Sequence, residues 1–411
     1  MDIDKLTALI IFVITYLGII FNKLPLLNLN RKTSAYAGSA AMILFGMISF
    51  EDAVKSIDFN TIVLLLGMMI IISALQLEGF FTLISRKTMS SAKNTSRLLT
   101  LVVFITGIAS AFLVNDAVVL LFTPVIINIC KKSSVNSIPF LLGEIFSSNA
   151  GSLMTITGNP QNMIIGIASG ISYAKFIVYM LPIAIVSMLI IIYIIKKTNR
   201  DIFSKKQIIK TANEDGETYN LKNMRATLII FVLVVLGFFF GKIFNLSIPL
   251  IALVGSALTI MFSKQDSKEI FKGVDFSLLL FFASLFIIVA AVKQCGVLDA
   301  VFEITLHKNA VSLLIIFALS LVLSQLVSNV PYTILVLPIF TLANSQILWL
   351  SLAASSTLAG NLTIIGAMAN LIVIEQAEKE GVKITARKFY RPAILITILT
   401  YLFAIVMFMI Y

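Results

Sequence analysis

Long apolar runs recur along the whole chain, and they limit the fold more than any other feature. Examples in the first half of the chain cover residues 59–79, 97–130, 138–172 and 174–196, and similar runs follow in the second half. About 20 apolar residues cross a bilayer as a helix, which bonds all of its backbone groups internally. Only 12% of the 411 residues are charged and 59% are hydrophobic, so the chain lacks the polar surface of a soluble protein. The sequence predicts an all-α polytopic membrane protein and excludes a soluble enzyme, a disordered chain and a fibre.

The apolar runs are of two kinds. Simple spans are expected at 6–22, 34–49, 59–79, 174–196, 225–244, 248–263, 276–293 and 389–411. Four other runs contain polar, glycine or proline residues in their middle, which indicates helices that break inside the membrane. We expect re-entrant hairpins at 97–130 and 311–341, and broken helices at 138–172 and 345–374.

The second half of the chain repeats the first. Short motifs recur in the same order with offsets of 217, 214 and 208 residues: Gly38-Ser39-Ala40 and Gly255-Ser256-Ala257, Asn115 with Pro124 and Asn329 with Pro338, Thr155-Ile156 and Thr363-Ile364. Collinear matches of this kind indicate an internal duplication. We predict a first repeat at 1–196, a basic cytoplasmic linker at 197–224 and a second repeat at 225–411, each repeat with about five spans, a re-entrant hairpin and a broken helix.

The basic residues predict the orientation. With five crossings in each half and both termini outside, 25 of the 31 Lys and Arg residues fall in cytoplasmic loops, as the positive-inside rule requires. The net charge of +11 therefore reflects topology, and no nucleic-acid partner is expected. Because five is odd, the halves would enter the bilayer in opposite directions, as inverted repeats of secondary transporters do. The first segment lacks the charge order of a signal peptide, so we expect it to be a membrane helix. We expect a multi-pass protein of the cytoplasmic (inner) membrane.

The four breaks are the candidate site. Irregular backbone at membrane depth is tolerated where it is buried in protein or lines a cavity. Freed carbonyls, hydroxyls and amides can bind a small cation, and half-helix N-termini attract anions. Asp116 is an ionisable group in an apolar run, which is functional by default; capping of the second hairpin helix is the alternative. Its equivalent is Val330, so acid–base chemistry at the tips would be asymmetric. Glu144, at the start of a broken helix, is either a site residue or interfacial.

Other chemistry has little support. Cys130 and Cys295 have no metal-ligand spacing and are expected to be ordinary thiols. His307 lies in a polar loop. The spans contain no nucleophile–base pair or metal cluster, and the chain has no phosphate-binding loop. We therefore expect neither an enzyme nor a cofactor other than a coupling Na⁺ or H⁺.

At these motifs the sequence resembles the ion transporter superfamily, which includes arsenite permeases, sodium/proton antiporters and divalent-anion/sodium symporters. The stretch 115–124 is similar to the Asn-Asp…Thr-Pro segment of the arsenite permeases, and Ser328-Asn329-Val330-Pro331 is similar to the Ser-Asn-Thr tip of the symporters. Gly158-Asn159-Pro160-Gln161-Asn162 resembles the Gly-x-Pro-x-Asn loop of the superfamily, in the form typical of its bacterial anion permease branch.

The resemblance implies a scaffold and a moving transport subdomain, in a homodimer that works by an elevator-type motion. It also implies that the tips and broken-helix loops hold Na⁺ and substrate. The matching positions are Asn115, Asp116, Ser148, Asn149, Thr155, Gly158, Asn162, Ser328, Asn329, Thr357, Gly360, Thr363, Gly366 and Asn370, with Na⁺ at Asn115, Asp116 and Asn329. The tips read Val-Asn-Asp and Ser-Asn-Val instead of Ser-Asn-Thr, which favours proton coupling or a monovalent cation over two Na⁺ and a dicarboxylate.

We therefore predict a secondary active transporter that moves an inorganic or carboxylate anion, coupled to Na⁺ or H⁺. The alternative is a Na⁺/H⁺ antiporter of the same fold, in which Asp116 binds the two cations competitively. A channel would lack alternating access. Arsenite, citrate and other carboxylates, sulfate, phosphate and silicate are all open as substrates.

Overall fold

A computed structural model of the chain describes residues 3–21, 30–204, 221–297, 306–307, 309–343 and 345–411. Over these residues the secondary structure is helical, without a strand. Eight helices of this part are long and apolar enough to cross a membrane: α1 (Ile3–Phe21), α4 (Phe59–Leu77), α6 (Thr95–Leu113), α10 (Tyr173–Thr198), α12 (Leu221–Phe240), α15 (Phe276–Gln294), α17 (Ala310–Val327) and α21 (Ala386–Ile410). The predicted all-α polytopic fold is confirmed.

The remaining helices are shorter. They are α2 (Arg31–Leu44), α3 (Phe50–Ser56), α5 (Phe80–Ser91), α7 (Asn115–Lys132), α8 (Ile138–Ser152), α9 (Pro160–Ser169), α11 (Arg200–Phe203), α13 (Ile248–Phe262), α14 (Ser267–Lys272), α18 (Asn329–Ala343), α19 (Gln346–Ala359) and α20 (Met368–Lys379), with 3₁₀ turns η1 (Ile156–Gly158) and η2 (Gly241–Phe244). In order, α1–α4 match α12–α15, and α6–α10 match α17–α21. Most of the predicted linker lies outside the described residues, so the repeat boundaries stay a prediction.

The span predicted at 34–49 has the wrong bounds, because capping residues start the helix, α2, at Arg31, and it ends at Leu44. The side chain of Asn30 accepts a hydrogen bond from Thr33 N, and Thr33 Oγ1 accepts one from Asn30 N. This capping box starts α2 at Arg31. Gly46, with φ at 76°, follows the end of the helix, in a conformation that glycine adopts without strain. The first turn of α2 therefore carries basic residues that the sequence placed in a loop.

Both hairpins are present, and each is broken at a single residue. Val114 separates α6 from α7 with φ at 62°, and Ser328 separates α17 from α18 with φ at 72°. A side chain in this region strains the backbone, most of all when it is β-branched like valine. The two strained positions are 214 residues apart, at equivalent places of the two halves. The other two runs break between α8 and α9 and between α19 and α20, as predicted.

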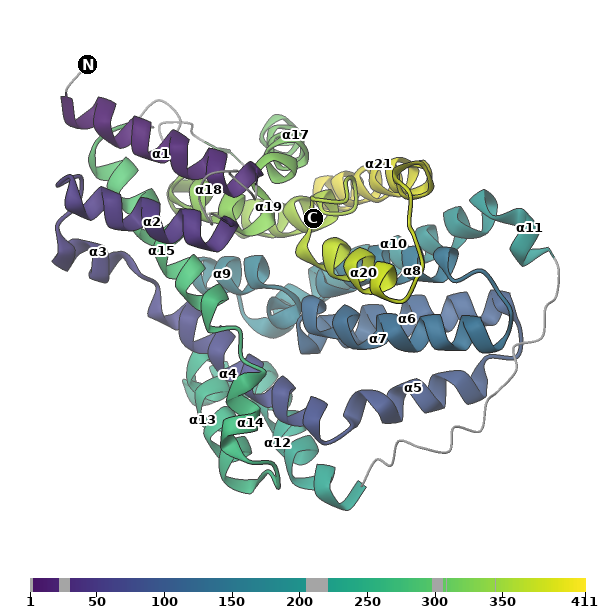
Figure 1. Cartoon of the computed structure of the whole chain (residues 1–411). Coiled ribbons are helices and arrows are strands. Elements are labelled where there is room, and N and C mark those ends of the chain that lie inside the picture. The colour runs from purple at the N-terminus through teal and green to yellow at the C-terminus, as the bar shows by residue number, and fades with distance from the viewer. Residues whose placement is uncertain (1–2, 22–29, 205–220, 298–305, 308, 344) are drawn as a thin grey trace.

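The helices form two groups (Figure 1). We call α1–α4 with α12–α15 the first helix group, and α6–α10 with α17–α21 the second helix group. In the first, α2 packs on α15 and α13 packs on α4; in the second, α7 packs on α20 and α18 packs on α9. In each group the second contact repeats the first between the equivalent helices: α13 with α4 is the equivalent of α2 with α15, and α18 with α9 is the equivalent of α7 with α20. Both groups therefore contain helices from the two halves of the chain.

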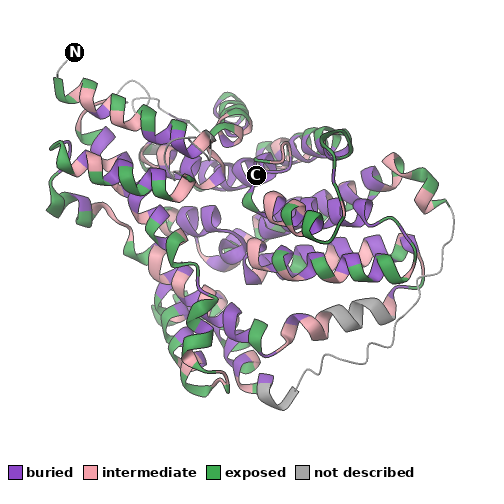
Figure 2. Ribbon diagram, viewed as in Figure 1, coloured by how far each residue is buried: buried purple, intermediate pink, exposed green. Residues whose placement is uncertain are grey.

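The most buried helices lie in the second helix group (Figure 2). Every residue of α8 is buried, and so are 347–359 of its equivalent, α19. Glycines bring α6 and α8 into backbone contact, since a Cβ placed on Gly151 would lie 2.1 Å from Gly107 O. The outward faces of helices such as α1, α12 and α21 expose large apolar side chains instead, as helices that face lipid do. The interior of the second helix group is thus tightly packed around the breaks.

Gly151→Ala should destabilise the protein. Its methyl group would meet Gly107 backbone atoms at 2.1–2.4 Å, and overpacking against a backbone that cannot yield costs about 1–3 kcal/mol or more. The melting temperature in detergent measures the effect. Gly237→Ala is the matched control, because its Cβ would meet a side-chain methyl group, Cγ2 of Ile251, at 2.9 Å and no backbone atom. Equal melting temperatures for the two variants would contradict the close α6–α8 contact.

Candidate ion and substrate site

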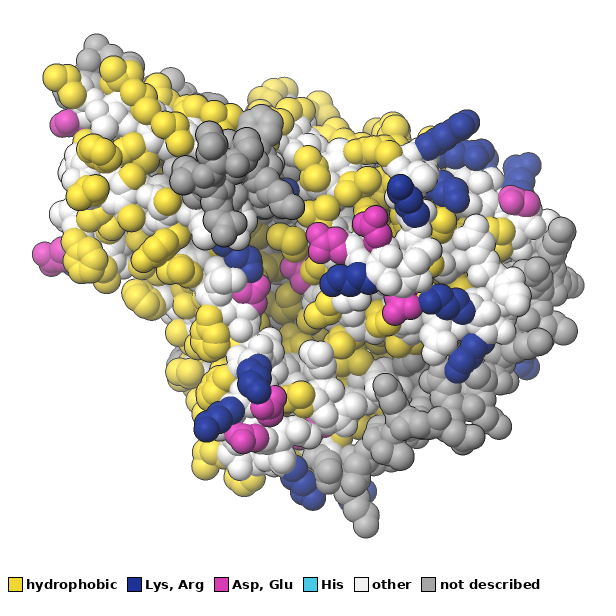
Figure 3. Space-filling view, viewed as in Figure 1, with side chains coloured by type: hydrophobic (Ala, Val, Ile, Leu, Met, Phe, Trp, Pro, Cys, Tyr) yellow, Lys and Arg dark blue, Asp and Glu magenta, His cyan; other side chains and the backbone are white. Residues whose placement is uncertain are grey.

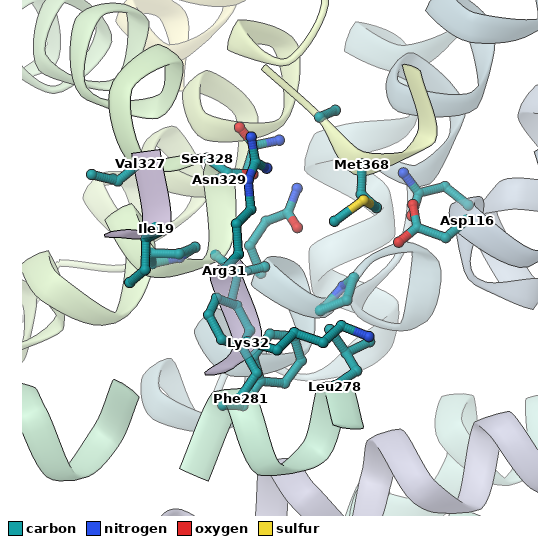
Figure 4. A pocket seen from close by; sticks show the side chains of 17 residues that line it. Ile19, Arg31, Lys32, Asp116, Leu278, Phe281, Val327, Ser328, Asn329 and Met368 are labelled. Atoms are coloured by element: carbon teal, nitrogen blue, oxygen red, sulfur yellow. The ribbon is translucent and has the colours of Figure 1, made fainter. Parts of the chain in front are cut away.

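The starts of four half-helices meet at one cavity of about 70 Å³ (Figure 4). This space holds several water-sized groups. The second helix group contributes Asn115 and Asp116 of α7, Pro160 and Gln161 of α9, Val327 of α17, Ser328 at the second tip, Asn329, Val330 and Pro331 of α18, and Ala367 and Met368 around the start of α20. The first helix group contributes Ile19, Arg31, Lys32, Leu278, Phe281 and Phe282. The cavity therefore lies where the two helix groups meet, and both hairpin tips border it.

The half-helix N-termini around the cavity differ in their capping. No side chain caps α7 or α20, whereas Asn159 Oδ1 caps α9 by accepting a hydrogen bond from Asn162 N at 2.8 Å. The first N–H groups of a helix have no partner within it, and together with the helix dipole they attract anions. The cavity thus has a positive backbone potential before any charged side chain is considered.

Two equivalent asparagines hold the unwound segments together. Each side-chain Nδ2 donates to two carbonyls of its own break: Ser152 O (3.2 Å) and Thr155 O (3.0 Å) for Asn162, and Gly360 O (2.7 Å) and Thr363 O (2.9 Å) for Asn370. The donors and acceptors are all 208 residues apart. Because carbonyls freed from a helix in an apolar interior are costly to leave unpaired, these two amides replace the missing helical hydrogen bonds.

The two breaks also bond to each other. Asn149 Nδ2 donates to Asn370 Oδ1 at 3.0 Å and to Asn361 Oδ1 at 2.9 Å. The equivalent of Asn149 is Thr357, and its Oγ1 donates to Asn162 Oδ1 at 3.4 Å. The breaks therefore form one buried polar network across the two halves of the chain.

Most of the predicted site residues belong to this network and not to the cavity lining. Of the fourteen, the cavity is lined by Asn115, Asp116, Ser328 and Asn329. The others support the breaks: Thr155 Oγ1 donates to Ala111 O, and a Cβ on Gly158 would lie 2.1 Å from Ser152 O. Around the second break lie Gly360, Thr363 and Gly366. A Cβ placed on Gly366 would lie 2.7 Å from Gln325 Oε1. Ser148 is buried beside the first break, and its hydroxyl has no hydrogen-bond partner among the described residues.

The two tip asparagines have different partners. Asn329 is satisfied when its amide nitrogen donates to Ser356 O at 3.0 Å and Gly366 O at 3.1 Å, an orientation assigned from these carbonyls. Asn115 Nδ2 donates to Asn149 Oδ1 at 3.4 Å, while its Oδ1 is shielded from solvent and has no partner in the described part of the chain. Asp116 is partly exposed, and its carboxylate turns into the cavity (Figure 4). The first tip therefore presents the amide oxygen of Asn115 and the carboxylate oxygens of Asp116.

Several cavity and network residues are not among those predicted from the sequence. Arg31 and Lys32 precede the predicted span at 34–49, although Asn30 and Thr33 have the spacing of a capping box, which starts α2 at Arg31. Gln325, three residues before the second tip, donates through Nε2 to Ala359 O at 2.9 Å and accepts from Thr363 Oγ1 at 2.7 Å. A glutamine inside an apolar run is the sequence feature that marks this position.

Glu144 is not interfacial, because its side chain is completely buried in α8. Both of its carboxyl oxygens lie 3.1 Å from Thr123 Oγ1, whose hydroxyl also donates to Val119 O at 2.7 Å. A hydroxyl has one hydrogen to donate. Thr123 therefore shares its hydrogen between Val119 O and the carboxyl group of Glu144. This hydrogen bond fixes the Glu144 side chain between α7 and α8.

No group of three or more His, Cys, Asp or Glu side chains within the described ranges is placed to hold a metal ion. Cys130 is buried, and Cys295 is partly exposed with its Sγ 3.5 Å from Met47 O.

Comparison with known proteins agrees with this architecture. The family model described as "Citrate transporter" matches residues 16–355. A 46 kDa membrane protein of Mycobacterium leprae is 28% identical over 96% of this chain and 95% of its own length. The silicon efflux transporter LSI3 of Oryza sativa is 26% identical, over 88% of each chain. The crystal structure of the YdaH transporter of Alcanivorax borkumensis is similar in fold, with a TM-score of 0.57 at 12% identity over 100% of this chain and 98% of that one.

Asn162→Ala and Asn370→Ala should each lower stability, because each leaves two buried carbonyls without a donor. An unpaired buried group costs about 1–3 kcal/mol. The melting temperature in detergent tests this, with Asn60→Ala as the control, since Asn60 is exposed at the start of α4. A melting temperature for either variant equal to that of Asn60→Ala would refute the bridging role.

Glu144→Gln should destabilise the protein less than Glu144→Ala does, because the amide oxygen of the glutamine can still accept a hydrogen bond from Thr123 Oγ1. Glu144→Ala should lower stability by about 2–5 kcal/mol, through the cavity that it creates and the lost hydrogen bond. Thermal unfolding of the two variants at pH 6 and pH 8 provides the measurement. Equal melting temperatures for the two variants would contradict the hydrogen bond between Thr123 and the side chain at position 144.

Proposed function

Since the chain belongs to the citrate transporter family, we propose that this membrane transporter is a secondary active transporter of a small inorganic or carboxylate anion, coupled to Na⁺ or H⁺. One observation carries the proposal. The N-termini of four half-helices and the carboxylate of Asp116 converge on a single cavity between the two helix groups. Such a site offers a positive backbone potential to an anion and oxygen ligands to a cation.

The anion is proposed to bind among the half-helix N-termini. The starts of α7 and α20 have no side-chain cap, and their N–H groups can donate hydrogen bonds to an anion. The family description names citrate and the rice relative's name concerns silicon. Both substrates are rich in oxygen, which is the chemistry that N–H donors recognise.

The coupling cation is proposed to bind at the first tip. Asp116 supplies a carboxylate, and Asn115 Oδ1 is a shielded oxygen without a partner in the described chain. Carboxylate and carbonyl oxygens suit hard cations. A proton on Asp116 would serve the same coupling. The second tip has Val330 in the place of Asp116, so we assign the cation to one tip only.

We propose that the second helix group moves against the first in an elevator-type cycle. The cavity lies between the groups, so a relative movement would change its exposure from one side of the membrane to the other. Its lining includes Arg31 and Lys32 at the start of α2, which the distribution of basic residues assigns to the cytoplasmic side. The proposed arrangement therefore faces the cytoplasm, with the two halves of the chain as inverted repeats.

Asp116→Asn should abolish the response to the coupling cation while the protein stays folded, because the amide carries no charge and neither gains nor loses a proton near neutral pH. The measurement is the melting temperature of the purified protein in Na⁺ and in K⁺, at pH 6 and pH 8, with citrate, sulfate, phosphate or silicic acid added. A ligand at about 100 times its dissociation constant stabilises the native state by about 2.7 kcal/mol. Asp201→Asn, at an exposed position of α11, is the matched control.

The same experiment separates the rival functions. A Na⁺ or pH response that is enhanced by an anion supports coupled anion transport. A Na⁺ response that weakens at low pH and ignores every anion identifies a Na⁺/H⁺ antiporter. An unchanged response in Asp116→Asn would remove Asp116 from the coupling site.

A further inference from the structure

Arg31 is an unexplained charge at the cavity. The capping box of Asn30 and Thr33 places it in the first turn of α2, where it lines the cavity. Its Nε and Nη1 atoms are shielded from solvent and have no hydrogen-bond partner among the described residues. Unpaired donors on a charged group are costly, so a cavity that keeps them unpaired is suited to a ligand that accepts hydrogen bonds.

The neighbouring lysine does not share this property. Lys32 Nζ lies 2.7 Å from Asp275 Oδ2 and 2.7 Å from Ser277 Oγ. Partial burial raises the pKa of Asp275, but the hydrogen bonds from Lys32 and Ser277 outweigh it and hold that pKa below its ordinary value. The carboxylate of Asp275 therefore neutralises Lys32. The charge of Arg31 has no such partner in the described structure.

Arg31 and Asp116 occupy different parts of the cavity. In the close-up view the Arg31 side chain extends toward Ser328 and Asn329 at the second tip, whereas Asp116 lies across the cavity, beyond Met368 (Figure 4). The second tip starts α18, whose first turn contains a proline and no acidic residue. A guanidinium and a half-helix N-terminus thus meet on the side away from the carboxylate.

We propose that Arg31 recognises the negative charge of the substrate and holds an ionised oxyanion or carboxylate against the Ser328–Asn329 tip. The inference rests on the proposed function and adds to it a substrate class: the transported species is charged, and is not a neutral acid such as undissociated silicic acid. The planar guanidinium presents paired N–H donors that match carboxylate and oxyanion geometry. The cation is bound separately, at the Asp116 tip.

The position of Arg31 also makes the contact dependent on conformation. Arg31 is part of the first helix group, and Ser328 and Asn329 border the second. The equivalent of Arg31 in the other half is Ile248, which lines a different cavity of about 410 Å³ where the nearby cation is Lys242. A space-filling view shows the molecule hollowed between the groups, with basic and acidic side chains at the edge (Figure 3). Arg31 would therefore hold the anion in the present arrangement and release it when the groups slide.

The test compares Arg31→Gln and Arg31→Lys with a matched control, Arg387→Gln. Arg387 is exposed on α21. Binding of citrate, sulfate, phosphate and silicic acid to the purified full chain is titrated at pH 7. For the anion that the wild type binds, Arg31→Gln should raise the dissociation constant roughly 10- to 100-fold, as the loss of a charge-assisted hydrogen bond does. Arg31→Lys should bind with intermediate affinity, and Arg387→Gln should bind as the wild type does.

A second readout separates recognition from folding. The cation-dependent rise in melting temperature should be equal in Arg31→Gln and the wild type, since the cation site lies at the other tip. If Arg31→Gln does not fold, a reduced anion affinity in Arg31→Lys supports the proposal, and an unchanged one overturns it. Equal anion affinities of the wild type and Arg31→Gln would overturn the role of Arg31 while the proposed function stands. Binding of silicic acid alone, alike in both proteins, would overturn both.

Discussion

Backbone that leaves a helix inside an apolar interior must find new hydrogen-bond partners, and the rest of this structure depends on how that constraint is met. Each of the two broken helices frees carbonyls where water is excluded. One asparagine in each half, Asn162 or Asn370, bonds the carbonyls of its own break. These amides fix the paths of the unwound segments, and hence the points from which α9 and α20 start toward the cavity.

The same constraint joins the two halves into one site. Neither break is isolated, since Asn149 and Thr357 reach across to the asparagine of the opposite half. The surrounding α8 and α19 are buried over nearly their whole length, so the network cannot exchange its partners for water. We infer that the second helix group behaves as a stiff body. A stiff body allows the cavity between the groups to change its exposure without loss of the half-helix geometry.

The fold could largely be predicted from the sequence, because apolar length and collinear motifs depend on local pattern alone. Both hairpin tips and both breaks lie where Asn115, Ser328, Gly158 and Gly366 indicated. The composition of the cavity could not be predicted equally well. Many of the predicted residues turn toward the buried network, since the direction of a side chain in an unwound segment depends on tertiary packing. Arg31 could not be recognised as a cavity residue for another reason: a basic residue near a span end is already explained by the positive-inside rule.

A duplicated transporter faces two opposite demands. Equivalent helices allow two similar arrangements of the groups, which alternating access needs, but two identical tips could not distinguish a cation from an anion. The described structure combines both properties. The backbone breaks, the supporting asparagines and the helix pairings recur in each half, whereas the charged groups do not. The equivalent of Asp116 in the second half is Val330, and the equivalent of Arg31 is Ile248. Because the backbone of the site is symmetric and its charges are not, the proposed binding of a cation at one tip and an anion at the other depends on a few side chains, which can change without altering the fold.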